Sequence, residues 1–251
     1  MAWVPILAFF VLTVSFSLEG WACWIMIMPL FLISASLGGF LGGWIKTKGS
    51  SNNLQISFLV LLPFILAPLE SMIAKNDATF RADTFIDINA PVPRIWSNVT
   101  RVSEIPEQQN TGNLSKFLGL PRPLKAELNY EGVGARREAI FTNGLVFHET
   151  VTEYEHERKL VLSVKANPHE IPSTALDEHV MIGGKFFEVQ KGTYEIEKLN
   201  RGKYRLHLYS HFILKTHFNF YVGWWAKWIM KDIQQNILRA VKARAEGKVN
   251  I

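Results

Sequence analysis

Hydrophobic positions run almost unbroken through the first part of the chain and alternate with polar positions in the rest. Three apolar runs, residues 3–18, 21–45 and 54–69, lie within the first 74 residues. A helix that crosses the hydrocarbon core of a bilayer needs roughly 20 apolar residues, and about 17 suffice. The second run predicts a membrane span and the two shorter runs predict two more, so we expect about three N-terminal transmembrane helices.

A cleaved signal peptide is the alternative for the first run. No basic residue precedes that run, no small-x-small cleavage site follows it, and the next apolar run begins at once. We therefore expect a retained span, with Glu19 and Gly20 in the turn before the second span. Two pairs of glycines in the second run, Gly38 with Gly42 and Gly39 with Gly43, have the spacing that permits close helix–helix contacts in lipid. We expect those contacts within this chain rather than between copies of it.

From about Ala78 the pattern indicates a mixed α and β domain. Residues 79–88 predict a strand that stops at Ala90-Pro91, and a short helix with Ile95, Trp96 and Val99 on one side follows. A loop-rich stretch is expected as far as about Arg122. Further strands are predicted over residues 124–134, 135–144, 145–155, 159–167, 185–199 and 203–214.

Short turns join these strands, and Asn143-Gly144 is the strongest of them, because asparagine and glycine tolerate the positive φ angles of a tight hairpin. Consecutive strands with short turns indicate an antiparallel sheet. A long amphipathic helix closes the chain. Its predicted apolar face consists of Trp225, Trp228, Ile229, Ile233, Ile237 and Val241.

Charge separates the two parts of the chain. Residues 1–74 hold four charged side chains whose charges cancel, so the formal net charge of +5 belongs to the remainder. We therefore divide the chain into a membrane anchor, residues 1–76, and a soluble domain, residues 77–251. Lys46 and Lys48 lie between the second and third spans, and positive-inside reasoning places them in the cytoplasm and the soluble domain on the extracytoplasmic side. Cys23 is the only cysteine, which excludes an intramolecular disulfide and a cysteine-based metal cluster.

Several stretches resemble one protein superfamily in order along the chain. Residues 85–107, FIDINAPVPRIWSNVTRVSEIPE, resemble the opening of the START-like (SRPBCC) superfamily, and residues 130–155 match the pattern of its membrane-attached members. Those members are described as polyketide cyclase/dehydrase and lipid transport proteins. Matching positions in residues 130–155 are Gly132, Val133, Gly134, Ala135, Arg137, Gly144 and Glu149, and the stretches 191–199, 204–206 and 237–246 also fit.

The resemblance implies an α+β helix-grip fold, in which an antiparallel sheet wraps a long C-terminal helix around a deep apolar cavity. Superfamily members bind sterols, lipids, polyketides or plant hormones there, and a minority catalyse reactions. The chain departs from close relatives at Gln234 and Ala240, where we would expect histidines. We expect an integral protein of a bacterial inner membrane.

Arg137 and Glu149 are the first candidates for polar contacts with a ligand. Arg137 shares a strand face with Ala139 and Phe141, and Glu149 shares one with Phe147 and Val151. If both faces line the cavity, the two charges form a pair in an apolar wall and could orient the polar end of a ligand. A solvated pair on the outer face of the sheet is the alternative, and the sequence leaves both open.

Histidine chemistry has weaker support. His207, Tyr209 and His211 alternate with the more apolar set Leu206, Leu208, Ser210 and Phe212, so we expect the histidines to face solvent. A metal site would need a third ligand, and the only other candidate group nearby is the stretch NPHE, which contains His169. We predict no metal and no cofactor.

The apolar ligand-binding candidates, in addition to Arg137 and Glu149, are Phe141, Phe147, Phe187, Leu208, Phe212, Trp225 and Trp228. The tryptophans of the last helix fit core packing, cavity lining or docking on a membrane, where lysine and arginine neighbours attract anionic headgroups. No nucleophile elbow, phosphate loop or nucleotide fingerprint is present, and we expect no nucleic-acid partner.

Three functions fit the sequence. The one we favour is binding, with transfer as an extension, of a lipid-like hydrophobic molecule by a membrane-anchored domain. A cyclase or dehydratase that uses an acid or base such as Glu149 in the same cavity is the second. The third is a structural subunit whose cavity is filled by side chains.

Overall fold

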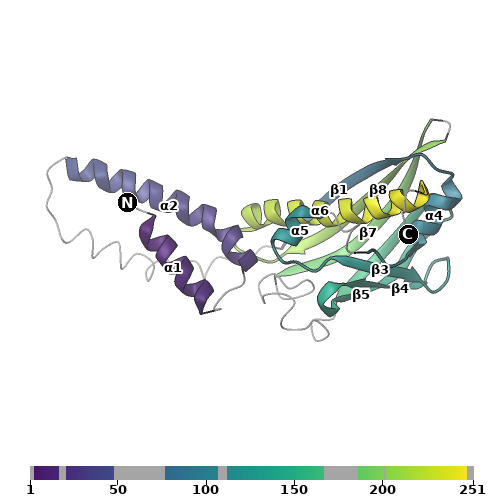
Figure 1. Ribbon diagram of the computed structural model, residues 1–251, viewed down its shortest axis with the longest axis horizontal. Coiled ribbons are helices and arrows are strands. Elements are labelled where there is room, and N and C mark those ends of the chain that lie inside the picture. Colours follow the sequence, from purple (N-terminus) through teal and green to yellow (C-terminus); the bar gives the residue numbers. More distant parts are fainter. Residues whose placement is uncertain are drawn as a thin grey trace. The chain divides into compact units, whose positions relative to one another are not determined.

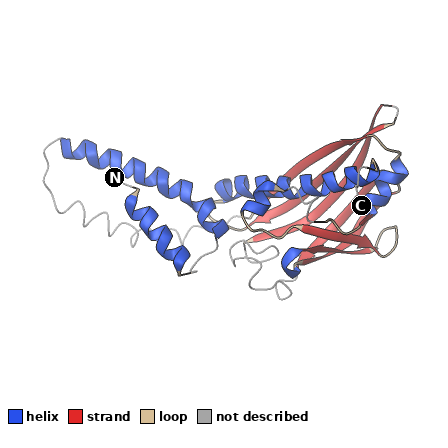
Figure 2. Ribbon diagram, viewed as in Figure 1, coloured by secondary structure: helices blue, strands red, loops and turns tan. Residues whose placement is uncertain are grey.

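A computed structural model of the chain describes residues 3–16, 21–47, 77–106, 112–166, 186–200 and 202–247. The chain divides into two units, Met1–Asn76 and Asp77–Ile251, and each has its own secondary structure (Figures 1 and 2).

Two apolar helices form the described part of the first unit: α1 (Val4–Ser15) and α2 (Trp21–Thr47). The expectation of about three spans is not met, because within the described residues one helix, over Ala22–Trp44, is long and apolar enough to cross a membrane. The 12 residues of α1 extend about 18 Å, well short of a bilayer core of about 30 Å. The third apolar run, and the turn expected at Glu19-Gly20, lie outside the described residues.

α2 continues through Pro29 and through its four glycines. A Cβ atom added to Gly38, Gly42 or Gly43 would meet nothing within 4 Å. The close helix contact at these glycines therefore stays a prediction.

Within the described residues of the second unit, eight antiparallel strands form one sheet, in the order β1-β8-β7-β6-β5-β4-β3-β2. The first strand pairs along its length with the last, from Ala78 opposite Leu214 to Ile88 opposite Tyr204. The strands are β1 (Ala78–Ile88), β2 (Arg101–Val102), β3 (Pro123–Leu128), β4 (Arg136–Phe141), β5 (Val146–Glu155), β6 (Lys159–Ala166), β7 (Phe187–Asn200) and β8 (Lys203–Leu214).

In the part of this unit that the structure describes, three α-helices accompany the sheet: α4 (Val92–Thr100), α5 (Asn113–Phe117) and the 27-residue α6 (Asn219–Ala245). α6 runs along the sheet, and α4 lies near its C-terminal end (Figure 1). The short β2 and α5 occur in the stretch that we expected to be rich in loops. Asp232 of α6 holds α5 in place, because its carboxylate accepts hydrogen bonds from the backbone and hydroxyl of Ser115, at 2.9 and 2.8 Å.

Local sequence signals act where they were expected. Pro91 is extended and precedes α4, whose residues Ile95, Trp96 and Val99 are buried. Asn143 and Gly144 adopt positive φ angles of 60° and 75° in the turn between β4 and β5. The inner face of β8 consists of Leu206, Leu208, Ser210 and Phe212, all buried, which confirms the predicted orientation of this strand.

Among the described residues of the second unit, most buried apolar side chains belong to two clusters. The larger, which we call the main core, includes Ile88, Trp96, Leu160, Leu206 and Leu238. The smaller, which we call the end cluster, consists of Ala82, Phe212, Leu214 and Met230, with Phe80, Phe187, Val189, Val222 and Ala226 packed against it.

Trp228 differs from the sequence-based expectation. It was assigned to the apolar face of the last helix, yet 48% of its surface is exposed, whereas Trp225 is buried. Residues three apart on a helix are separated by about 60° around its axis, which places Trp228 beyond the edge of the buried face while Trp225 stays inside it.

Candidate functional site

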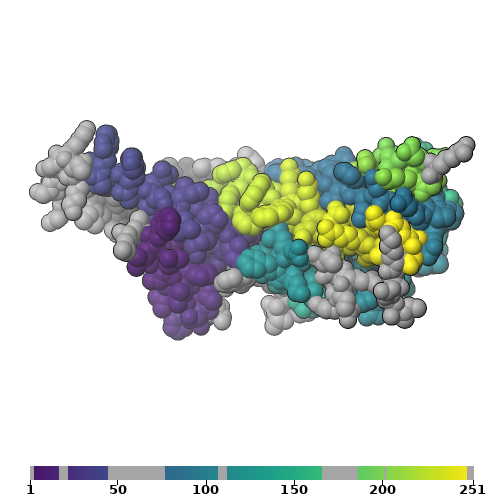
Figure 3. All heavy atoms as spheres, turned by 45° about the horizontal axis from the view of Figure 1, so that its top comes forward, coloured from purple at the N-terminus to yellow at the C-terminus, as the bar shows by residue number. Residues whose placement is uncertain are grey.

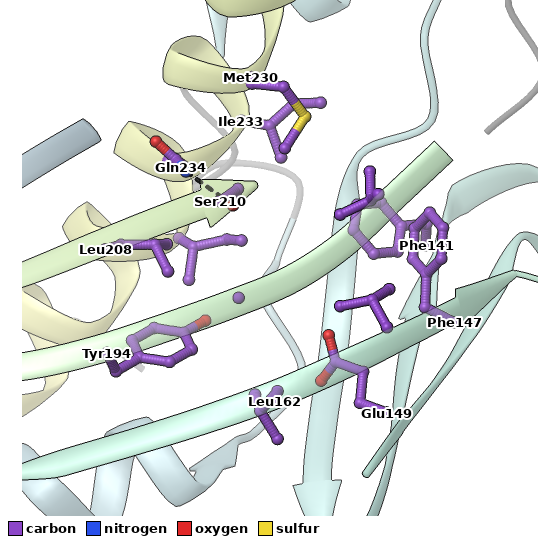
Figure 4. Close-up of a pocket in the computed structure, with 14 residues that line it drawn as sticks. Phe141, Phe147, Glu149, Leu162, Tyr194, Leu208, Ser210, Met230, Ile233 and Gln234 are labelled. Atoms are coloured by element: carbon purple, nitrogen blue, oxygen red, sulfur yellow. Dashed lines mark hydrogen bonds between the residues drawn. The ribbon is translucent and has the colours of Figure 1, made fainter. Parts of the chain in front are cut away.

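A cavity of about 90 Å³ lies between the sheet and α6 (Figure 4). Strands β4 to β8 supply one wall and α6 supplies the other. The lining residues are Phe141, Phe147, Glu149, Leu162, Val164, Val189, Gly192, Tyr194, Leu208, Ser210, Met230, Ile233, Gln234 and Ile237.

A buried ion pair lies at the wall of this cavity. Arg137 of β4 and Glu149 of β5 are directly opposite each other in the sheet, and the Arg137 Nε atom is 3.4 Å from Glu149 Oε2. Only 4% of the arginine side chain and 13% of the glutamate side chain are exposed. The pair therefore occupies the inner face of the sheet, and the alternative of a solvated outer pair is excluded.

The ion pair has hydrogen-bonding capacity that its surroundings do not use. In the part of the chain that the structure describes, Arg137 Nε and Nη1 and Glu149 Oε2 have no hydrogen-bond partner. A buried donor or acceptor without a partner is costly. Glu149 is the member of the pair that lines the cavity.

Burial also changes the acid–base chemistry of the site. Desolvation raises the pKa of the Glu149 carboxyl, and the positive charge of Arg137 opposes that rise. Desolvation likewise raises the pKa of the Tyr194 phenol, and the Arg137 guanidinium carbon lies 5.5 Å from the centre of the Tyr194 ring. Glu149 points into the cavity in Figure 4, where its protonated form could donate a proton or a hydrogen bond.

A second polar group lies across the cavity. Gln234 of α6 is buried, and its amide nitrogen donates to Ser210 Oγ at 2.8 Å and to the Ala82 carbonyl at 3.3 Å. Thr84 donates its hydroxyl proton to Gln234 Oε1 at 3.1 Å. These bonds satisfy the amide, so Gln234 joins α6 to β1 and β8 rather than leaving a free group for chemistry.

The structure places the sequence-based site residues in five different environments. Phe141, Phe147, Glu149 and Leu208 line the cavity, and Arg137 lies behind Glu149. Phe187 and Phe212 belong to the end cluster. Trp225 is buried outside the cavity lining, and Trp228 lies at the surface.

The predicted site did not include the other lining residues, which are Leu162, Val164, Val189, Gly192, Tyr194, Ser210, Met230, Ile233, Gln234 and Ile237. Gly192 and Tyr194 alternate along β7 and could have been found by the period of a strand. Met230 lies at helical spacing from Ile233 and Ile237, so the period of the last helix could have found it.

Histidines do not gather at this site. His207 faces outward and contacts Glu197, with its Nε2 2.9 Å from Oε2. Among the described residues, no group of three histidine, cysteine, aspartate or glutamate side chains could hold a metal ion. His169 lies outside those residues.

No family model matches the sequence, and no curated protein matches it either. Solved structures are similar at low identity. A START superfamily protein from Mycobacterium smegmatis is 12% identical with a TM-score of 0.44, over 67% of this chain and 99% of that one. Truncated norcoclaurine synthase from Thalictrum flavum is 13% identical with a TM-score of 0.41, over 68% and 95%. A protein from Nitrosospira multiformis is 15% identical with a TM-score of 0.40, over 67% and 98%.

The START-like fold of the second unit is visible in its own topology. Its sheet is antiparallel throughout, its first and last strands are paired, and one long C-terminal helix packs on the inner face. This is the helix-grip arrangement that the sequence led us to expect.

Proposed function

We propose that this protein is attached to a membrane and binds a hydrophobic, lipid-like small molecule in the cavity between the sheet and α6. The observation that carries the proposal is the apolar cavity with the Arg137–Glu149 pair buried in its wall. Apolar burial, worth roughly 25 cal/mol per Å², would supply most of the affinity. The unpartnered Arg137 donors and the Glu149 carboxyl would hold the polar end of the ligand.

The size of the cavity bears on what can bind. Ordinary small-molecule sites occupy about 300–1,000 Å³, and this cavity occupies about 90 Å³. A lipid-like ligand therefore enters only if lining side chains move. Met230 is suited to such movement, because it is unbranched and its thioether adapts to the available shape.

Membrane attachment is supported by α2, whose segment Ala22–Trp44 has the length and composition of a span. A signal sequence close to the N-terminus would have the same properties. Attachment would keep the binding domain close to a bilayer-derived ligand and raise its effective concentration. The inner membrane of a bacterium, with the domain on the extracytoplasmic side, remains the proposed location.

An enzymatic function is the second candidate, favoured by one observation. Glu149 lines the cavity, and burial raises its pKa. A protonated acid beside Arg137 and Tyr194 is an arrangement that general acid catalysis uses. A cyclase or dehydratase acting on a hydrophobic substrate would place the reacting oxygen beside this carboxyl.

Gly192 offers a direct test of ligand binding. It lies opposite Ser210 and Leu162 on the inner face, and a Cβ atom added to it would meet nothing within 4 Å. Gly192→Leu would therefore fill the cavity without removing a charge. Lys191→Leu is the matched control, because the adjacent residue of β7 pairs with the exposed Glu153 on the outer face.

The full chain, purified in mild detergent, would be examined by native mass spectrometry and its bound molecules extracted. We expect a stoichiometric hydrophobic molecule in the wild type and in Lys191→Leu, and its loss in Gly192→Leu. A wild type that carries nothing, and that takes up no added lipid, would leave the filled structural subunit as the better description. Turnover of a bound molecule that stops in Glu149→Gln would favour the enzyme.

A further inference from the structure

Large aromatic side chains are exposed on one face of the first half of α6. Phe220, Trp224 and Trp228 follow one another at intervals of four residues, and they are 75%, 57% and 48% exposed. Lys227 and Lys231, also exposed, occur at positions that share this side of the helix. We call these five residues the aromatic–basic face. The first half of α6 lies at the surface in Figure 3.

Packing of the domain does not account for this face. The opposite side of the same helical turns already supplies Trp225, Met230 and Ile233 to the interior. The rings of Trp224 and Trp228 lie 5.4 Å apart and form a continuous apolar patch. Contiguous exposed apolar surface commonly marks a site of interaction with a protein, a membrane or a ligand.

The aromatic–basic face lies at the end of the domain where the chain enters from its first 76 residues. Ala78, the first residue of β1, pairs with Leu214, and α6 begins only five residues after Leu214. Phe80 packs so closely against α6 that a Cβ atom on Gly223 would lie 2.5 Å from its ring. The residues before Ala78 include Ala22–Trp44, the segment with the length and composition of a membrane span.

The chemistry of the face fits one kind of partner. Tryptophan and phenylalanine partition to the interface of a bilayer, and adjacent lysines attract anionic headgroups. None of the five residues is acidic, and the nearest carboxylate on this helix, Asp232, is engaged by Ser115. A face that binds nucleic acid would carry more than two cationic side chains. A protein partner would not explain why the face lies at the end of the domain where the chain enters.

We propose that the aromatic–basic face of α6 docks on the surface of a membrane that contains anionic lipid. This inference rests on the membrane attachment proposed above, but it does not depend on the cavity ligand. Docking would place the end cluster next to the bilayer. Met230 belongs both to the end cluster and to the cavity lining, so one layer of side chains would separate the docked face from the cavity.

Spin labels on single cysteines test the docking surface in the full chain. Cys23→Ser removes the only native thiol, and Phe220→Cys or Trp224→Cys then places a label on the face. Phe85→Cys is the matched control, because Phe85 is an aromatic residue of similar exposure, 53%, on the outer side of β1. The labelled proteins would be reconstituted in vesicles of phosphatidylcholine, with and without phosphatidylglycerol.

Labels at positions 220 and 224 are expected to collide with oxygen more than with a water-soluble nickel complex, and the label at position 85 should show the reverse. Adding Lys227→Glu and Lys231→Glu should shift the first two labels toward nickel access in vesicles that contain phosphatidylglycerol. Nickel access at all three positions would overturn the proposal. Labels at 220 and 224 that are shielded from both reagents would overturn it too, because protein rather than lipid would then cover the face.

Carbonate extraction of the same vesicles tests the anchor separately. Retention of the chain supports attachment through the N-terminal unit. Release of a chain whose labels still report lipid would keep the docking surface and overturn only the proposed anchor. Lipid retention in the cavity is measured without vesicles, so failure of the cavity function is also distinguishable from failure of docking.

Discussion

The two ends of the helix-grip domain are built differently. At the end that holds α4, Ile88, Ile95, Trp96 and Val99 are almost completely buried and join the main core. At the entry end, where β1 and α6 begin, a smaller cluster, a cavity and exposed aromatic rings replace that continuous packing. The comparison shows that continuous side-chain packing is concentrated at the closed end, and this difference fits the proposed rearrangement of the entry end around a ligand.

The hydrogen bonds of polar side chains at the closed end also differ from those of the ion pair at the cavity. At the closed end Trp96 donates its indole proton to the Tyr154 hydroxyl at 3.2 Å, and Glu246 accepts a bond from the backbone of Asn89 at 2.9 Å. At the cavity, by contrast, buried atoms of Arg137 and Glu149 lack partners within the described residues.

The largest difference in unfolding free energy is expected between variants of two tryptophans, one at each end of the domain. Trp96→Ala removes a side chain that is 2% exposed in the main core, so we expect a loss of about 3–5 kcal/mol in unfolding free energy. Trp224→Ala removes one that is 57% exposed and should change it by less than about 0.5 kcal/mol. Thermal unfolding in detergent, followed by near-ultraviolet circular dichroism, measures both. Equal losses would contradict the proposed division.

The second-largest loss of stability is expected when one member of the Arg137–Glu149 ion pair is removed. Arg137→Met leaves Glu149 buried and unpaired, which we expect to cost about 3 kcal/mol. The double variant Arg137→Met, Glu149→Leu should recover much of that loss, because no buried charge remains. The same unfolding measurement decides this, and a double variant less stable than Arg137→Met would show that the pair itself holds the sheet together.

Crowding the first turns of α6 should have a smaller effect. Gly223→Ala places a methyl group 2.5 Å from the Phe80 ring and should cost about 1–3 kcal/mol. Gly192→Ala, whose methyl group would meet nothing within 4 Å, is the control and should be close to neutral. A Gly223→Ala variant with unchanged unfolding free energy would mean that the side chains at the entry end move aside more easily than their packing suggests.

The pH dependence of stability separates the buried pair from an exposed one. Burial raises the pKa of Glu149 above its ordinary value of 4.5, so the folded protein holds this proton more tightly than the unfolded chain. Its stabilising contribution is complete below the ordinary pKa and is lost as pH rises through the folded value. Asp87 behaves oppositely: a hydrogen bond from Arg205 lowers its pKa, so its contribution is present above 3.8 and is lost as pH falls through the lowered value.

Melting temperatures from about pH 4 to about pH 8 would show the difference. Glu149→Gln should remove a decline that the wild type shows as pH rises, and Asp87→Asn should leave that decline in place. A Glu149→Gln profile that still parallels the wild type would indicate that Arg137 keeps the carboxylate ionised throughout.

Local sequence decided the elements that depend on neighbouring residues. The alternation from Leu206 to Phe212 was enough to assign the inner face of β8, because successive side chains of a strand point to opposite sides. Ala90-Pro91 located the start of α4, and Asn143-Gly144 located a hairpin turn, because both signals act through the backbone itself.

Contacts between distant segments decided the rest. The period of β4 and β5 was compatible with an inward or an outward Arg137–Glu149 pair, and only the packing of the sheet on α6 made it inward. Trp228 lies outside, and Phe212 lies in the end cluster, because the rotation and position of α6 relative to β1 and β8 select which residues it covers. By itself, the sequence thus determined the order of elements and the residue types available for a pocket. The tertiary structure determined which of those residues meet, because a strand or helix has several faces and only its partners select the buried one.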